Sequence, residues 1–292
     1  MADGATARES AGVAGWRAGL RLTLRNRLVL FGALLVLGLI ALAVFASAIA
    51  PYDPTEMKVT DALKAPSWAH PFGTDRFGRD VLSRTIYGSR IAFGVAVSSI
   101  GMALAAGTLL GLIGGYWSGW PDVVIGRVMD ILFSFPTLIL AIAIAAMLGP
   151  GLDNAVLAIA VVYAPLFSRV ARGSVIAERA KDHVVAALGL GAGAARVVFR
   201  HILPNIAAPL IVQASVSLAY AILTEASLSY LGLGTQPPDP SWGTMLNEGR
   251  TYLETAPWMS VFPGLAIMLA VLAFNLCGDG LRNVLDPQLR GR

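Results

Sequence analysis

The sequence predicts an all-α integral membrane protein with six transmembrane helices. Three observations lead to this fold class. Only 14% of the 292 residues are charged, whereas a soluble domain carries roughly a quarter. Hydrophobic residues make up 56% of the chain, and the mean hydropathy is +0.67. Six apolar stretches can cross a bilayer core about 30 Å thick, which takes about 20 helical residues.

The six predicted spans differ in length and regularity. They are Leu28 to Ala50, Ile91 to Tyr116, Val123 to Leu148, Asn154 to Val170, Ile206 to Leu231 and Trp258 to Leu281. The fourth is the shortest. Prolines inside the spans remove a backbone hydrogen bond and are expected to kink their helices. These residues are Pro136, Pro165, Pro209 and Pro263.

The basic residues predict which side of the membrane each loop occupies. An even number of spans places both termini on one side. That side, which includes the loop between the fourth and fifth spans, carries fifteen of the 22 Lys and Arg residues. Because cytoplasmic loops are enriched in Lys and Arg, we expect both termini in the cytoplasm. The net charge of +4 follows this topology and forms no separate patch, so nucleic acid is not an expected partner.

The segment before the first span, residues 1–27, is predicted to be a cytoplasmic tail with an interfacial helix. Apolar residues recur every four positions from Trp16 to Leu24, and each is followed by an arginine. This pattern suits a helix on the cytoplasmic leaflet, with its apolar side chains in membrane lipid and its arginines at the head groups. A cleaved signal peptide is the alternative. The apolar run is too long for one, and Pro51 follows the last candidate cleavage point.

Three loops are long enough to carry function. The cytoplasmic loop covers about residues 169–204. The first external loop runs from Pro51 to about Arg90; it is expected to turn through Gly78 and then lead as an amphipathic helix into the second span. The last external loop, Gly232 to Pro257, begins with prolines and contains a candidate surface helix, TMLNEGRTYLET. Its aromatic residues suit a protein interface or the lipid boundary. These are Trp242, Tyr252 and Trp258.

Two ionisable residues fall close to membrane depth and are therefore functional candidates. Asp130 lies about two turns into the third span, near the cytoplasmic face. Glu225 comes roughly 28 Å along a helix that starts at Ile206, so we expect it near the outer surface. Each residue has two interpretations: a structural charge paired with an arginine, such as Arg127 for Asp130, or a pathway residue that contacts cargo. Ionisable groups at this depth are commonly paired with another group of the protein, and this favours the structural interpretation.

The sequence contains no pattern for catalysis or metal binding. The three histidines, His70, His183 and His201, fall in loops and lack metal-ligand spacing. The single cysteine, Cys277, excludes a disulfide within the chain. The phosphate-loop pattern G-x-x-x-x-G-K-[ST] is absent, and GLGAGA lacks the preceding strand that a dinucleotide site requires. We therefore expect no cofactor on this chain and no enzymatic activity of its own.

The cytoplasmic loop contains two short predicted helices separated by glycines. Asp182 is expected to cap the first, HVVAAL; the second, AARVVFRHI, is expected to stop before Pro204, with the turn at Gly191. Such short helices are marginal in water, so their apolar residues need a surface to bury against. Those residues are Val184, Val185, Leu188, Val197, Val198 and Phe199. The residues alone leave two readings open: packing on the chain's own bundle, or docking in the groove of a partner.

This loop resembles the cytoplasmic loop of binding-protein-dependent ABC importers, whose pattern is E-A-A, three residues, Gly, nine residues, I-x-L-P. The matching positions are Ala186, Ala187, Gly191, Leu203 and Pro204. Val185 stands where the family has Glu, and His201 stands at the Ile position. Four further segments resemble the permease subunits of the dipeptide, oligopeptide and nickel group, in particular the subunit with a compact first external loop. They are FGTDRFGRDVLSRTIYGSR, MDILFSFPTLILA, EASLSYLGLGTQPPDPSWGTML and LAFNLCGDGLRNVLDPQLR.

The resemblance implies an importer in the bacterial inner membrane, built from two different permease subunits, two ATPase subunits and an extracellular binding protein. Residues 28–292 are then the permease domain and half of the translocation pathway. ATP and Mg are expected on the ATPase subunits, and the external loops are expected to meet the binding protein. Contact with an ATPase subunit is expected at Val185, Ala186, Ala187, Leu188, Gly191, His201, Leu203 and Pro204.

The expected cargo is a di- or oligopeptide. Nickel or another small solute is the alternative within the same architecture. An ion-coupled secondary transporter is the rival from a different class, and it would be expected to show ion or substrate groups at discontinuous helices near the midplane.

Overall fold

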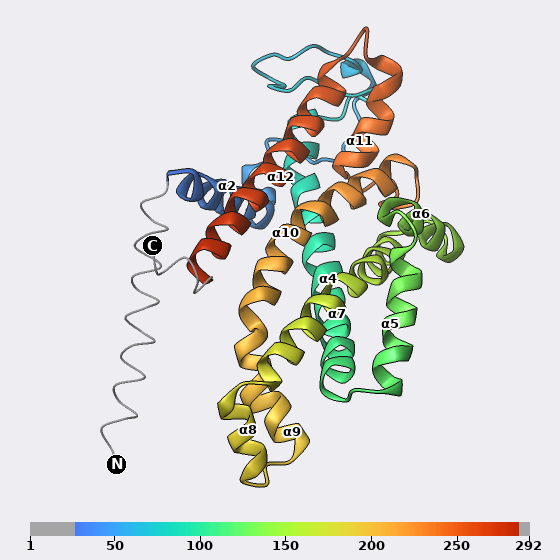
Figure 1. The fold of residues 1–292 in the computed structure, drawn as a ribbon. Helices are drawn as coiled ribbons and strands as arrows, with labels where there is room; N and C mark the ends of the chain where they lie inside the picture. The colour runs from blue at the N-terminus through green and yellow to red at the C-terminus, as the bar shows by residue number, and fades with distance from the viewer. Residues whose placement is uncertain (1–26, 286–292) are drawn as a thin grey trace.

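The computed structural model describes residues 27–285, which form a bundle of helices (Figure 1). Apart from one isolated antiparallel bridge between Thr74 and Asp80, this part of the chain contains no β-pairing. The predicted all-α class is therefore confirmed. The predicted interfacial helix falls outside the described residues.

The helices vary widely in length. In chain order they are α2 (Arg27–Val44), α3 (Ala46–Ile49), η1 (Val59–Asp61), α4 (Val81–Tyr116), α5 (Trp120–Phe133), α6 (Thr137–Leu148), α7 (Leu152–Arg179), α8 (Asp182–Gly189), α9 (Ala194–Arg196), η2 (Val197–Ile202), α10 (Leu203–Tyr230), α11 (Trp242–Gly249), η3 (Arg250–Tyr252) and α12 (Trp258–Leu285). Four helical segments of the described chain are long and apolar enough to cross a membrane on their own. They are Val81–Tyr116, Leu152–Arg179, Ala194–Tyr230 and Trp258–Arg282.

The third predicted span is not one kinked helix. It is two helices, α5 and α6, bent by 94° at the break between them. Pro136 lies in this break; it has no N–H to donate, and it disfavours a helical conformation for Phe135. The other prolines behave differently, because the helices that hold them continue past them. These are Pro165 in α7, Pro209 in α10 and Pro263 in α12.

The first predicted span, Leu28 to Ala50, is divided at Phe45 into α2 and α3. The apolar helix Val29–Val44 is shorter than the about 20 residues that a straight crossing takes. Helix α2 packs closely on α12: a Cβ atom added to Gly32 would lie 2.5 Å from Cβ of Leu276. The fourth predicted span, Asn154 to Val170, lies within a longer helix, α7, which covers Leu152–Arg179.

Helices α4 and α7 make the most extensive helix–helix contact of the described residues, and small residues explain why. Gly107, Gly111 and Gly115 recur every four residues along one face of α4 and are buried. A Cβ atom at Gly111 would lie 2.5 Å from both the carbonyl oxygen of Ser168 and Cβ of Ala171. Glycine at these positions lets the two backbones approach, as small residues do between membrane helices.

The two ends of the bundle carry different structures (Figure 1). Helices α8 and α9 lie together at one end, below α7 and α10. The long loop before α4 and helix α11 lie together at the opposite end. The regions that the sequence marked as the cytoplasmic loop and the external loops are thus separated by the length of the bundle.

Candidate functional site

The cytoplasmic loop forms a helical hairpin consisting of α8, a glycine turn and α9 with η2. Gly191 makes the turn, as predicted, with a φ of 81° in the left-handed region that favours glycine. Asp182 is not the cap of α8. The N-cap is Lys181, which makes no side-chain capping bond, and Asp182 lies in the first turn, where its charge still complements the helix dipole.

The second helix of the hairpin does not stop before Pro204. Ala194–Tyr230 is one continuous helical segment, in which the π-helix η2 leads directly into α10. Pro204 occupies the first turn of α10, a position where a missing N–H is tolerated. The prediction of a separate helix was wrong because it treated this proline only as a terminator.

The apolar residues of the hairpin divide between two surfaces. Val184, Val197 and Val198 are buried against the chain's own bundle. Four others remain exposed, a set that adds Leu190 to the residues expected from the sequence. They are Val185, Leu188, Leu190 and Phe199, with exposed fractions of 56%, 40%, 89% and 61%. The reading in which the loop packs on its own bundle is therefore confirmed for one face of the hairpin, and the other side chains are exposed.

The remaining positions of the family pattern differ in exposure. Ala186, Gly191 and Pro204 are exposed, whereas Ala187, His201 and Leu203 are half-buried. A further ionic contact ties the start of α8 to the end of α7. Glu178, which is buried, pairs with Lys181 and lies 3.3 Å from Nε2 of His183.

Asp130 pairs with Arg169 of α7 at 3.2 Å, and not with Arg127. A second pair joins the same two helices, since Nη2 of Arg172 donates to Oδ2 of Asp122 at 2.7 Å. These four side chains line a hollow of about 380 Å³ between α5 and α7. Asp130 is thus paired with an arginine of a different helix, and both side chains are more than 60% exposed.

Glu225 is fully buried near the α11 end of α10. Its Oε1 atom accepts hydrogen bonds from the hydroxyls of Ser229 at 2.7 Å and Thr235 at 3.3 Å. No salt bridge to Glu225 forms among residues 27–285. The expected arginine within the same subunit is therefore not found there, and hydroxyl groups hold the carboxylate instead. They connect α10 to the loop that leads into α11.

The opposite end of the bundle is a cap that joins the first and last long loops. Its centre is a buried ionic cluster: Arg79 bonds Asp75 at 2.5 Å and Glu248 at 2.7 Å. Arg84 approaches the same two carboxylates at 3.7 and 3.6 Å. Glu248 belongs to α11, whereas the other three residues belong to the first loop and the start of α4. The cluster therefore fixes the two loops to each other.

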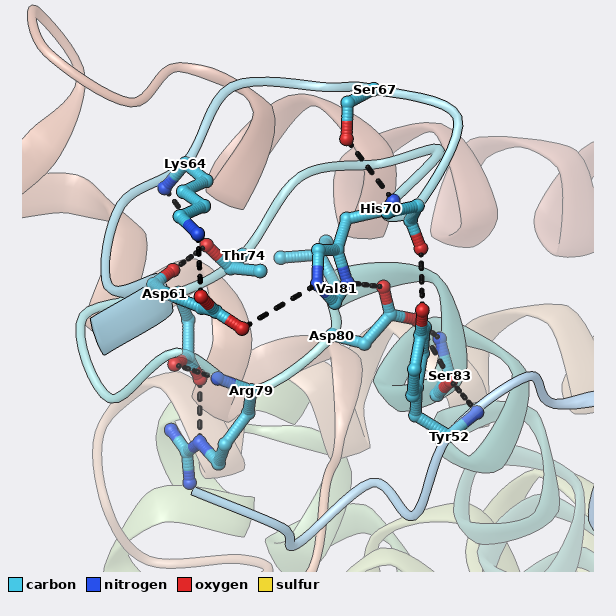
Figure 2. A network of polar contacts seen from close by, with 12 residues as sticks. Tyr52, Asp61, Lys64, Ser67, His70, Thr74, Arg79, Asp80, Val81 and Ser83 are labelled. Carbon is cyan, nitrogen blue, oxygen red and sulfur yellow. Dashed lines mark hydrogen bonds and ion pairs between the residues drawn. The ribbon is translucent and has the colours of Figure 1, made fainter. Parts of the chain in front are cut away.

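Further polar contacts order the first loop around His70 (Figure 2). Nδ1 of His70 lies 2.9 Å from Oδ1 of Asp80, whose other oxygen caps α4 by accepting from the N–H of Ser83. Asp61 approaches the other ring nitrogen at 4.0 Å. A hydrogen bond from Lys64 lowers the pKa of Asp61 below its ordinary value, so this carboxylate is ionised beside the histidine.

Two tryptophans fasten the cap to the bundle. Nε1 of Trp242 donates to the carbonyl oxygen of Thr85 at 2.9 Å, and Nε1 of Trp258 donates to that of Thr74 at 3.0 Å. Trp242 is 1% exposed, so the interface role expected for it is wrong: it packs inside the cap. The predicted turn at Gly78 is confirmed, and the predicted helix of the last loop is present as α11 followed by η3. Its expected surface position is wrong, because no residue of α11 is exposed.

The sequence interpretation missed the buried ionic cluster, which consists of Arg79, Arg84, Asp75 and Glu248. The segment TDRFGRD does hold four charges within seven residues of an otherwise apolar chain. That density is the one signal for a buried cluster, because it places opposite charges near each other. Glu248, however, follows 169 positions after Arg79, and nothing in a single sequence connects the two.

Two families of known proteins match this chain. The family described as "Binding-protein-dependent transport system inner membrane component" matches residues 107–291, and "N-terminal TM domain of oligopeptide transport permease C" matches residues 16–66. A dipeptide transport system permease protein of Alkalihalophilus pseudofirmus is 44% identical over 95% of this chain and 91% of its own length. A di/tripeptide transport system permease protein of Pseudomonas aeruginosa is 47% identical over 91% of this chain and 89% of its own.

A glutathione transport system permease protein of Pectobacterium atrosepticum is also similar, with 44% identity over 94% of this chain and 92% of its own length. These relatives are transport permeases and not enzymes. The matches cover nearly the whole chain, including the exposed hairpin and the cap. The chain therefore belongs to the family of binding-protein-dependent transport system inner membrane components, as a multi-pass permease subunit of the dipeptide and oligopeptide group.

Proposed function

We propose that this chain is one of two different permease subunits of an ATP-driven importer for di- or oligopeptides in the bacterial inner membrane. The observation that carries the cargo class is the identity of 44–47% to permease proteins of dipeptide, di/tripeptide and glutathione transport systems, over nearly their whole length. Two ATPase subunits bind ATP and Mg, and an extracellular binding protein delivers the peptide.

In this proposal the chain crosses the membrane six times, with both termini in the cytoplasm. Helix α2 with α3 makes the first crossing, and the broken pair of α5 and α6 makes the third. The distribution of Lys and Arg supports the orientation, because the side that holds the α8–α9 hairpin is the basic one. The cap around Arg79 and Glu248 is then extracellular.

The hairpin supplies the contact with an ATPase subunit. The hairpin lies at one end of the bundle (Figure 1), and its exposed apolar side chains are Val185, Leu188, Leu190 and Phe199. An apolar helix face of this kind suits insertion into a groove of a partner. Closure of the ATPases on ATP would move α8, and η2 would carry that movement into α10.

The broken helix α5–α6 is the feature that a secondary transporter would share. What favours the ABC importer is the exposed hairpin, since an ion-coupled transporter has no ATPase to dock. The importer proposal also explains why the cap is rigidly cross-linked: a preformed extracellular surface can receive a binding protein with little ordering cost.

Uptake by the reconstituted complex tests this function. The chain is co-purified with its second permease, the ATPase subunits and the binding protein, and placed in vesicles containing ATP. We expect labelled dialanine to accumulate, and accumulation to stop when the ATPase subunits are omitted. Nickel accumulation without peptide accumulation would refute the peptide cargo. Peptide uptake driven by an ion gradient without ATPases would refute the importer class.

A further inference from the structure

A hollow of about 360 Å³ lies where α6, α7 and α10 meet. Hydroxyl-bearing and aliphatic side chains line it, and none of the lining residues is acidic or basic. They are Thr137, Leu138, Tyr163, Tyr220, Leu223, Thr224 and Ser227. Its size falls within the range of pockets that hold small ligands.

Two features of this hollow suit a position on the route through the membrane. Thr137 is the first residue after the 94° break between α5 and α6. Irregular backbone at membrane depth is tolerated where it is buried in protein or lines a water-filled cavity. Tyr163 lies 11 residues into α7, about 16 Å from its start, and Thr224 lies six residues before the end of α10 at Tyr230, about 9 Å along the helix. The hollow is therefore inside the bundle but nearer to its cap end. Polar side chains at that depth face the bundle interior or a cavity.

The hydroxyl groups of the hollow have a defined polarity. Thr224 Oγ1 donates to the carbonyl oxygen of Tyr220, and Ser227 Oγ donates to that of Leu223, each at 2.8 Å. The hydroxyl of Tyr163 lies 3.4 Å from Oγ1 of Thr224. Because the hydroxyl proton of Thr224 is already donated to the carbonyl oxygen of Tyr220, the hydroxyl of Tyr163 is the donor in its contact with Thr224. The protons of these three hydroxyls are therefore used within the protein, and each oxygen has at least one lone pair left for a ligand. The other two hydroxyls of the lining, on Thr137 and Tyr220, make no side-chain hydrogen bond with the described residues and can donate or accept.

We propose that this uncharged, acceptor-rich hollow is a cargo subsite that binds the N–H donors of a peptide in transit, namely its main-chain amides and its amino terminus. The inference rests on the proposed function and gives it a location. Hydroxyl oxygens accept hydrogen bonds from any peptide main chain. Since no lining residue carries a charge, the hollow does not discriminate between acidic and basic cargo side chains. The second permease subunit would complete the walls of the subsite.

Paired substitutions at Thr224 test the proposal. Thr224→Val removes the hydroxyl with little change of shape, whereas Thr224→Ser keeps it. In vesicles that contain the complete importer with saturating dialanine-loaded binding protein, we expect Thr224→Val to lower the peptide transported per ATP hydrolysed about tenfold, the effect of losing one good hydrogen bond. Thr224→Ser should stay within about twofold of the wild type on the same reasoning. Tyr163→Phe should lower transport per ATP hydrolysed as Thr224→Val does. It replaces Thr224→Val in the test if that variant does not assemble.

Thr108→Val is the matched control. Thr108 is a buried residue of α4 whose hydroxyl makes no hydrogen bond with the described residues, and it lies outside the hollow. It should leave transport per ATP unchanged. Equal transport by Thr224→Val, Thr224→Ser and wild type would overturn the subsite while leaving the peptide importer intact. If the wild-type complex itself moves no dialanine, the proposed function fails, and the two failures are distinguishable.

Discussion

Arg79 and Glu248 lie 169 positions apart in the sequence, and Nη2 of Arg79 donates to Oε2 of Glu248 at 2.7 Å. Their side chains are 2% and 14% exposed, so the pair is shielded from water and from salt. Asp75 and Arg84 complete the cluster from the other side. A single set of charges thus holds the first and last long loops of the chain in one cap.

Removing Arg79 should destabilise the cap strongly. Arg79→Ala leaves two buried carboxylates with less compensating charge, and breaking a buried pair in this way costs about 3–5 kcal/mol. We expect a clear fall in the melting temperature of the purified permease complex. Arg169→Ala is the control, because Arg169 and Asp130 form an ion pair whose side chains are more than 60% exposed. Such pairs contribute about 0–1 kcal/mol. Equal melting temperatures for the two variants would argue against a stabilising role of the cluster.

Cysteine labelling tests whether the hairpin docks on an ATPase subunit. In a background where Cys277 is replaced by Ala, a cysteine at Leu188 should react with a maleimide in the isolated permease and be protected in the full complex. The reason is that Leu188 is exposed, whereas Val184 of the same helix is fully buried. A cysteine at Val184 should be unreactive in both preparations. Undiminished labelling at Leu188 in the assembled importer would place the ATPase contact elsewhere.

Gly191 provides a sharper test of coupling. Its φ of 81° is costly for a side chain with a Cβ, by roughly 1–2 kcal/mol. No heavy atom lies within 4 Å of an added Cβ, so the effect of a substitution comes from the backbone alone. We expect Gly191→Val to reduce transport per ATP hydrolysed, and Gly191→Asn, which tolerates this conformation, to reduce it less. Gly189→Val, at a position with ordinary φ and open space, is the control. Equal effects at both glycines would show that the turn conformation is unimportant.

Glu225→Gln should be mild. With no arginine paired to Glu225 among the described residues, the substitution leaves no charge uncompensated, and Gln can still accept from Ser229 and Thr235. The expected loss is about that of weakening one or two hydrogen bonds, 0.5–1.5 kcal/mol each. Glu225→Ala removes the acceptor altogether and should lower the melting temperature of the complex further. If Gln is as damaging as Ala, an unidentified positive partner, such as one from the second permease, must hold this carboxylate.

The effect on stability of replacing a glycine of α4 by alanine should depend strongly on the position of that glycine. Gly111→Ala places a Cβ against the backbone of α7 and should reduce stability, because neither helix can yield without moving apart. Gly101→Ala, on the same helix with open space around it, should raise helix stability by up to about 1 kcal/mol. Melting temperatures of the two purified variants should therefore shift in opposite directions. A similar shift for both would indicate that the α4–α7 contact is looser than the structure shows.

The fold class and the long spans were predictable because membrane crossing imposes a compositional rule on every residue of a helix. The break at Pro136 was not, since residues 123–148 are equally apolar whether the helix is straight or bent by 94°. Proline removes one hydrogen bond in either case. Pro165, Pro209 and Pro263 show that its consequence depends on the neighbouring helices.

The hairpin was predictable in position and turn but not in orientation. Val184 and Val185 are adjacent and chemically identical, yet one is buried and the other is 56% exposed. Only the packing of α8 against η2 and α7 decides between them. The charged cluster was invisible for a related reason. Its members are brought together by tertiary structure over long sequence separations, which a single sequence does not record.

The continuity of Ala194–Tyr230 has a mechanical consequence. A helix of 37 residues is about 55 Å long and reaches from the hairpin to the cap. Helix α10 packs against α12, α4 and α7, and a long helix that tilts as one body within such contacts acts as a lever. The two ends of a lever move in opposite directions. A pull that draws the hairpin end inward would swing the Glu225 end outward, so that narrowing the passage on one side of the membrane widens it on the other.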